Sequence, residues 1–256
     1  MAWLSSIVRW AVAAVVIACS LIAGINSASA GEQSLSREQR RIIENHVRQY
    51  ILNHPEIIAE SIQKMQAREE RESQERTRKN LVAMRDQLAN DPTSPVGGNP
   101  NGDVTIVEFF DYRCAFCKRT LPAITKVLKT DFKVRYVFKE LPILGPDSVT
   151  AARAALAAWR INPAKYQKFH FALMESRGQL PETKVMAIAA KVGLGVDALK
   201  AAMRGPEIKK TIERNSKLAH VLGINGTPAF VIGNNLVPGA IDFATIQQLI
   251  ANARGI

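Results

Sequence analysis

The sequence predicts an α/β fold that follows a separate, wholly helical N-terminal segment. Residues 101–256 alternate between β-rich apolar runs and helical patterns, which is typical of a sheet covered by helices. Residues 31–90 contain only helical patterns, and a stretch rich in proline, glycine and asparagine at residues 91–100 predicts a linker between the two parts. With 256 residues, the chain has room for one domain with a full core and an additional segment.

The first 30 residues have the pattern of a cleaved signal peptide. Arg9 supplies a positive charge, residues 10–25 are apolar, and Ala28-Ser29-Ala30 offers small residues for cleavage. We therefore expect export to the periplasm. A retained membrane anchor is the second interpretation, but the apolar run is shorter than the roughly 20 residues that span a bilayer. Lipidation at Cys19, which loosely fits a lipoprotein cleavage box, is the third.

The chain is basic, with a formal net charge of +11. Basic and acidic residues are mixed along it, and no basic stripe is interleaved with aromatic residues. The charge therefore gives no indication of nucleic-acid binding. A basic protein in a compartment bordered by anionic membranes is the simpler interpretation.

The N-terminal part, residues 31–90, predicts two short amphipathic helices and a charged helix. Ser36 is the expected N-cap of the first helix, with Gln39 in the capping-box position, and Pro55 ends that helix. Apolar residues recur at helical spacing at Ile42, Ile43, Val47, Tyr50 and Ile51, and then at Ile57, Ile58, Ile62 and Met65. Residues 68–79 lack apolar side chains and predict a solvated spacer.

These apolar stripes need a partner surface. They can pack on the main domain as a helical hairpin, or they can pair with copies of themselves. We favour a homo-oligomer formed through residues 35–66, because the charged run separates the stripes from the main domain.

Two of the three cysteines, Cys114 and Cys117, remain after removal of a signal peptide. A bond between residues three apart closes a very short loop and constrains the unfolded chain little, so the spacing indicates reactivity. Cys114 follows a β-rich run at residues 104–110 and begins a predicted helix, whose free N–H groups favour a thiolate. We expect Cys114 to form a mixed disulfide and Cys117, one turn further, to resolve it.

A zinc site and a purely structural disulfide are the alternatives for this pair. Zinc normally takes four cysteine or histidine ligands. The histidines are scattered along the sequence, at His46, His54, His170 and His220. We expect no metal, and no cofactor other than the redox-active Cys114–Cys117 disulfide.

Three separated motifs resemble the DsbA-type thioredoxin-fold family. They lie at residues 108–118, at residues 138–155 and at residues 223–230. The resemblance covers about residues 96–256, within a domain that we place at residues 91–256. It implies a thioredoxin fold with a helical insertion at about residues 147–222. It also implies a thiol–disulfide oxidoreductase that acts on unfolded or misfolded exported proteins and is reset by a membrane redox partner.

The same resemblance assigns roles to residues around the pair. Pro228 is cis in the family and faces the cysteines, and the backbone of Thr227 holds an extended substrate segment. Glu108 corresponds to a buried acid that exchanges a proton with the resolving thiol. Lys139 is its expected ionic partner.

Phe116 occupies the position at which the strongest oxidants of the family have histidine. Without that donor we expect the pKa of Cys114 to fall less, which makes the protein a milder oxidant. A milder redox potential suits an isomerase or a reductase as well as an oxidase, and we favour an isomerase or a general oxidoreductase over a dedicated oxidase. We also count Phe116 among the substrate-binding residues.

Residues 46–56 resemble the N-terminal segment of the ScsC-like branch of the family. That branch is linked to copper tolerance, and some of its members trimerise through this segment. The alternative function is therefore a non-enzymatic holdase or a copper-scavenging thiol protein.

Overall fold

The computed structural model describes residues 35–255. The expected signal peptide, its interpretation as an anchor and the lipidation of Cys19 all fall outside these residues. Residues up to Gln66 belong to one compact unit, and residues from Ala67 form another. Among the described residues, no helix is both long and apolar enough to cross a membrane.

The first unit contains α2 (Arg37–Asn53) and the beginning of α3 (Glu56–Ala83). The expected capping box is present: the Gln39 N–H donates to Ser36 Oγ at 3.2 Å, and the Ser36 N–H donates to Gln39 Oε1 at 2.9 Å. The helix ends before Pro55, as expected. No residue of α2 is buried, and apolar side chains remain exposed at Ile42, Ile43, Val47, Tyr50, Ile58, Ile62 and Met65.

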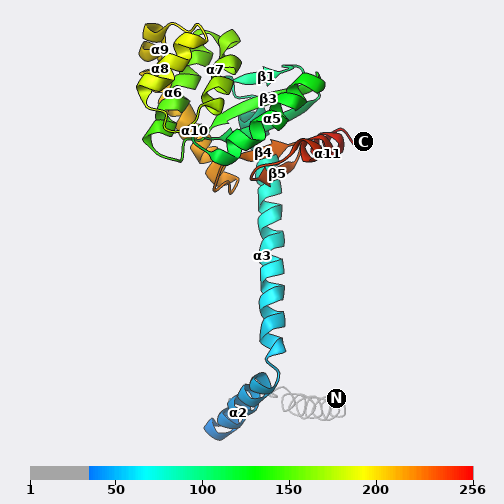
Figure 1. Cartoon of the computed structure of the whole chain (residues 1–256). Helices are drawn as coiled ribbons and strands as arrows, with labels where there is room; N and C mark the ends of the chain where they lie inside the picture. The colour runs from blue at the N-terminus through cyan, green and yellow to red at the C-terminus, as the bar shows by residue number, and fades with distance from the viewer. Residues whose placement is uncertain (1–34, 256) are drawn as a thin grey trace, which may run out of the picture. The chain divides into compact units, whose positions relative to one another are not determined.

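The second unit is built on a five-stranded sheet of order β1-β3-β2-β4-β5 (Figure 1). The strands are β1 (Val96–Gly98), β2 (Val104–Phe110), β3 (Val134–Glu140), β4 (Ala229–Ile232) and β5 (Asn235–Pro238). β2 and β3 are parallel, and the other neighbours are antiparallel. Strand β1 lies in the stretch expected to be a linker. It forms a strand because its backbone pairs with β3, and its two glycines give no alternation of apolar side chains from which a strand could be predicted.

Helices cover the sheet in an order that confirms the expected thioredoxin fold with a helical insertion. They are α4 (Arg85–Ala89), α5 (Ala115–Thr130), α6 (Pro146–Ile161), α7 (Pro163–Glu175), α8 (Glu182–Lys191), α9 (Val196–Met203), α10 (Pro206–Val221) and α11 (Phe243–Arg254). Helix α5 connects β2 to β3, and α6 to α10 lie between β3 and β4 in the chain. Figure 1 shows α6, α7, α8 and α9 gathered together beside the sheet.

The alternation of side chains along β2 and β3 divides the core into two clusters. The first cluster joins Ile106, Phe110, Tyr136 and Phe138 to both cysteines, to α5 to α9 and to α11. The second joins Val107, Phe109 and Val137 to Leu81 of α3, Leu88 of α4 and Leu218 of α10. Each face of the sheet is therefore buried, and the two cysteines belong to the first face.

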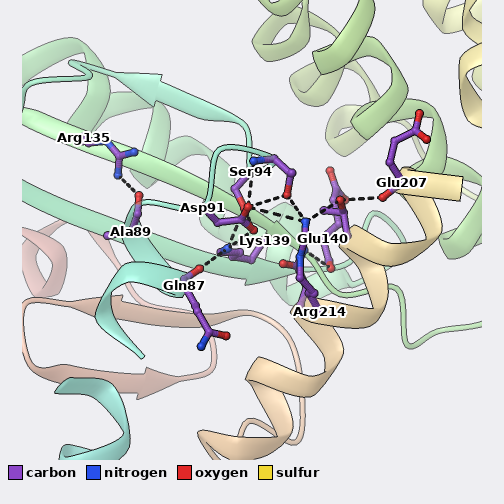
Figure 2. A network of polar contacts seen from close by, with 12 residues as sticks. Gln87, Ala89, Asp91, Ser94, Arg135, Lys139, Glu140, Glu207 and Arg214 are labelled. Atoms are coloured by element: carbon purple, nitrogen blue, oxygen red, sulfur yellow. Dashed lines mark hydrogen bonds and ion pairs between the residues drawn. The ribbon is translucent and has the colours of Figure 1, made fainter. Parts of the chain in front are cut away.

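Lys139 lies on the second face and is not the partner of Glu108. Glu108 is in register with Phe138, so the next residue of β3 projects from the opposite side of the sheet. Figure 2 shows where the ammonium goes instead. Its Nζ donates to the Gln87 carbonyl at 2.7 Å, to Ser94 Oγ at 2.8 Å and to Asp91 Oδ2 at 3.2 Å. The expected Glu108–Lys139 pair was therefore wrong.

These contacts attach the segment between α4 and β1 to the sheet. Arg135 Nη1 adds a hydrogen bond to the carbonyl of Ala89 at 2.5 Å, and Arg214 Nη2 lies 3.8 Å from Asp91 Oδ1 (Figure 2). The Lys139 side chain is only 1% exposed, so water cannot solvate its ammonium group and these partners stabilise its positive charge instead.

We expect Lys139→Met to lower the free energy of unfolding by about 3 kcal/mol, because it removes the nearer cation of a buried ion pair and leaves Asp91 with only Arg214, at 3.8 Å, as its counter-charge. Urea denaturation measures this change. Lys133→Met alters an exposed lysine just before β3 and is the control, with an expected change within about 0.5 kcal/mol. A loss no larger than that of the control would contradict the assignment.

Candidate active site

Cys114 is the N-cap of α5 and follows the end of β2 by a short connection, residues 111–113. Its Sγ accepts a hydrogen bond from the backbone N–H of Cys117 at 3.4 Å. The Cys114 thiol donates to the carbonyl oxygen of Thr227 at 3.1 Å, a contact that only the protonated form can make. Both cysteines are free thiols and are buried, at 5% and 2% exposure. The fold thus brings the Thr227 carbonyl into contact with the sulfur of Cys114, although the two residues are 113 positions apart in the sequence.

The two thiols have pKa values shifted in opposite directions. The hydrogen bond from the Cys117 thiol lowers the pKa of Cys114 to about 5 despite desolvation, helped by a hydrogen bond from the side-chain hydroxyl of Thr227 and by the backbone N–H groups of Cys117 and Phe116. Burial, followed by the hydrogen bond to Cys114 and the charge of Glu108, raises the pKa of Cys117 far above its usual range. At neutral pH, Cys114 is therefore a thiolate and Cys117 retains its proton.

Glu108 is buried on the same face of the sheet as the cysteines, with 4% exposure. Tyr136 Oη donates to Glu108 Oε2 at 2.5 Å. Burial raises the pKa of Glu108 to about 8; the Tyr136 hydrogen bond lowers it in part, and the charge of Cys114 raises it further. Tyr136 was not among the expected site residues. Its position on β3 follows from the alternation of that strand, but its contact with Glu108 depends on the parallel register.

The remaining expected residues lie at the edges of this site. The Thr227–Pro228 peptide bond is cis, as the resemblance implies, and directly precedes β4. Phe116 is 54% exposed on the first turn of α5, and the guanidinium of Arg119 lies 4.3 Å from its ring centroid. Thr227 therefore contacts the reactive sulfur, whereas the ring of Phe116 faces solvent.

Asp111 holds the connection between β2 and Cys114 in place, a role that sequence reasoning missed. Its carboxylate is buried and accepts four hydrogen bonds. Oδ1 accepts from the Arg113 N–H and from Ser148 Oγ, both at 2.7 Å, and Oδ2 accepts from the N–H groups of Ile143 and Leu144 at 2.8 and 3.0 Å. The loop after β3 and the first turn of α6 are thereby fastened to the cysteine loop. An acid directly after an apolar strand was the available signal.

A second buried acid, Glu140, also stabilises the connection between β2 and Cys114, through Tyr112. Its Oε1 accepts hydrogen bonds from Tyr112 at 3.2 Å and from Tyr166 at 3.3 Å, and Tyr112 Oη also lies 2.9 Å from His170 Nδ1. Burial raises the pKa of Glu140 well above its usual value and lowers the pKa of His170 to about 3. Burial therefore disfavours charge on both the acid and the histidine, and the hydrogen bonds of the cluster hold Tyr112 in place two residues before Cys114.

Two family descriptions match the chain. Residues 105–251 match the DSBA-like thioredoxin domain, and residues 39–72 match the N-terminal domain of the copper resistance protein ScsC. The first match covers more than half of the sequence, and the second begins within α2.

Two solved structures resemble the chain. A thioredoxin-like oxidoreductase from Silicibacter pomeroyi is 46% identical, with a TM-score of 0.65 over 67% of this chain and 98% of that one. The catalytic domain of Proteus mirabilis ScsC is 30% identical, with a TM-score of 0.65 over 70% of this chain and 99% of that one.

Curated relatives match a similar share of the chain. The Na(+)/H(+) antiporter NhaA 1 of Salinispora arenicola is 26% identical over 62% of this chain, but the chain spans only 24% of that antiporter. Disulfide bond formation protein D of Bacillus subtilis is 26% identical over 61% of this chain and 75% of that protein. The chain therefore belongs to the DsbA-like family of thioredoxin-fold oxidoreductases, and it carries an ScsC-type N-terminal segment.

Proposed function

We propose that this protein catalyses thiol–disulfide exchange in exported proteins, with Cys114 as the attacking and Cys117 as the resolving cysteine. The observation that carries the proposal is a pair of buried free thiols at the N-terminus of α5, where Cys114 is the N-cap and its Sγ accepts the backbone N–H of Cys117 at 3.4 Å. This setting lowers the pKa of Cys114 to about 5 and raises that of Cys117. A thiolate at a helix N-terminus is a nucleophile, and a neutral thiol beside it cannot compete for the same target.

The exchange proceeds in two steps, formation of a mixed disulfide and its resolution. The Cys114 thiolate attacks one sulfur of a substrate disulfide, forming a mixed disulfide and releasing the other sulfur as a thiolate. Cys117 then gives its proton to the Glu108 carboxylate and attacks Cys114 Sγ, which releases the second substrate sulfur with the electron pair. Loss of the Cys114 charge in the mixed disulfide removes one cause of the raised pKa of Glu108, so its carboxylate form becomes more populated when it is needed.

An isomerase agrees with this chemistry better than a dedicated oxidase. A pKa of about 5 for Cys114 lies between the value of about 3.5 for the strong oxidant DsbA and that of about 7 for thioredoxin. Phe116 supplies no charge to the thiolate, in line with an intermediate poise. When neither the reduced form nor the disulfide form of Cys114 and Cys117 is strongly favoured, the thiolate can attack a substrate disulfide and can also be released again, as disulfide reshuffling requires.

The periplasm is the proposed location, with unfolded exported proteins as substrates and a membrane redox partner that resets the pair. The signal-peptide pattern supports this, as does a solved relative from Salmonella enterica serovar Typhimurium that is described as a periplasmic thioredoxin-like protein, 31% identical with a TM-score of 0.61. For the alternative of copper scavenging, the candidate ligands are the two cysteine sulfurs, since no three potential metal ligands cluster within residues 35–255.

Self-association through residues 35–66 is the second part of the proposal, with a trimer as the form that the family resemblance favours. Its support is the row of exposed apolar side chains along α2 and the start of α3, at Ile42, Ile43, Val47, Tyr50, Ile58, Ile62 and Met65, together with the match to the ScsC N-terminal domain. Several active sites in one assembly suit an enzyme that holds a misfolded chain while its bonds are exchanged.

The activity is tested on scrambled ribonuclease and on insulin. We expect the wild-type protein to restore ribonuclease activity and Cys114→Ala to abolish this, because the attacking thiolate is lost. Cys117→Ala is the informative partner variant, since without a resolving thiol it accumulates mixed disulfides that a non-reducing gel detects. Full activity of Cys114→Ala in both assays would support the non-enzymatic alternative instead.

The role of Glu108 is tested through the pH dependence of stability in the reduced protein. The pKa of Glu108 is about 8 in the folded state and has its ordinary value of 4.5 in the unfolded state. Between these two pH values Glu108 loses its proton only in the unfolded state. The free energy of unfolding therefore falls as pH rises from 4.5 to 8. We expect Glu108→Gln to gain stability over the wild type steadily across the window, as urea denaturation at each pH shows. Tyr136→Phe removes a contact that lowers the folded pKa of Glu108, so the fall in stability still begins near pH 4.5 but continues to a higher pH. A constant difference between Glu108→Gln and wild type would sink the assignment.

Self-association is tested by light scattering of the full chain. We expect Val47→Asp with Ile62→Asp to convert an oligomer into a monomer, because charges are placed in the apolar stripe. Arg48→Asp with Gln63→Asp, in neighbouring exposed positions, is the control that retains the assembly. A wild-type protein that is already a monomer at micromolar concentration rules out this part of the proposal.

A further inference from the structure

A groove of about 750 Å³ lies beside the active-site helix, between α5 and the C-terminal end of α7. Its charged lining is almost entirely basic: Lys118, Arg119, Lys126, Lys129 and Arg177, with Glu175 as the acid. Leu121, Pro122 and Met174 contribute apolar surface between these charges. The groove is therefore lined by both apolar and cationic side chains.

The ion pairs among the described residues include none of these five basic residues. Within residues 35–255, none of them lies within 4.0 Å of a carboxylate, although the fold pairs other cations such as Arg254, which contacts Asp103 at 2.7 Å and Asp131 at 2.8 Å. Unpaired charges of one sign around a concavity focus a positive potential there. Such a surface favours an anionic occupant.

Lys118 fixes the two walls of the groove to each other. Its Nζ donates to the carbonyl oxygens of Ser176 at 2.7 Å, Met174 at 2.8 Å and Leu173 at 3.4 Å, which terminate α7. Since Lys118 directly follows Cys117, the groove is held in a set position relative to the reactive pair. Less ordering is then required when a ligand binds.

The groove is close enough to Cys114 for one bound chain to reach both. At a rise of about 1.5 Å per residue, Lys118 lies about 6 Å and Lys129 about 22 Å along α5 from Cys114. An extended chain advances about 3.3 Å per residue, so these distances correspond to roughly two to seven residues. Arg119, stacked on Phe116, lies at the near end.

We propose that this basic groove binds an acidic segment of the polypeptide whose cysteine reacts at Cys114. The inference rests on the proposed function and adds a substrate preference to it: glutamate or aspartate roughly two to seven residues from the reacting cysteine. A single extended chain suits the site better than a lipid surface, because the cations surround a concavity and a planar bilayer meets a projecting surface more readily.

The preference is tested with peptides that carry one cysteine as a mixed disulfide with 2-mercaptoethanol. One peptide of each pair has four glutamates three to six residues from the cysteine and the other has four glutamines, with pairs made for both sides of the cysteine. We expect reduced wild-type protein to react about tenfold faster with the glutamate peptide of one pair at low salt. The ratio is expected to approach one at about 0.5 M salt, where screening is strong.

Variants separate the groove from the net charge of the protein. Lys129→Gln with Arg177→Gln, one from each wall, is expected to reduce the glutamate-to-glutamine rate ratio about three- to fivefold. Lys210→Gln with Lys217→Gln, exposed on α10, changes the net charge equally and is expected to leave the ratio intact. Equal ratios in both double variants would contradict the proposal.

Two further measurements distinguish the ways in which the idea can fail. Reaction with the small neutral 2-hydroxyethyl disulfide reports on Cys114 alone, so its absence would overturn the proposed function. Normal reaction with that disulfide and no preference for glutamate peptides would overturn the groove assignment only. Binding to vesicles with about 30% anionic lipid, lost in Lys129→Gln with Arg177→Gln while both peptides react equally, would identify a membrane contact and also overturn it.

Discussion

The parallel pairing of β2 with β3 is the constraint on which the rest of the site depends. Because the strands are parallel and in register, both finish at the same end of the sheet. There Cys114 follows β2, and the loop whose N–H groups bind Asp111 follows β3. It also determines which side chains share a face: Tyr136 reaches Glu108 below the cysteines, while Lys139 projects to the other side. A slip of one residue in this register would exchange the two faces and separate the acid from the thiols.

Burial then acts differently on each ionisable group of the site. Desolvation penalises the charged forms of Glu108, Glu140 and His170, so it raises the pKa of both acids and lowers that of the histidine. Cys114 is the exception, since donors from the first turn of α5 and the side-chain hydroxyl of Thr227 stabilise its negative charge. The nucleophile is thereby confined to one sulfur, and the surrounding polar groups supply position and proton transfer without competing charges.

The chemistry-bearing pair and most elements could be predicted because their signals are local. The spacing of Cys114 and Cys117 after a β-rich run placed them at a strand–helix junction, and the capping box at Ser36 is contained within four residues. Strand β1 escaped prediction because edge pairing to β3 depends on backbone groups that every residue has. Lys139 was assigned the wrong partner because a charge in an apolar strand does not reveal which face it occupies until the neighbouring strand is placed.

By itself, the sequence determined the α/β order, the helical N-terminal segment and the location of the redox pair, since periodicity, caps and spacing act over a few residues. Tertiary structure alone decided that Thr227 meets Cys114, that Tyr136 hydrogen-bonds Glu108 and that Asp91 neutralises Lys139. It also decided that cations of α5 face the end of α7 across one groove. These contacts join residues between 28 and 113 positions apart, where pairing is set by sheet register and helix packing and leaves no trace in local pattern.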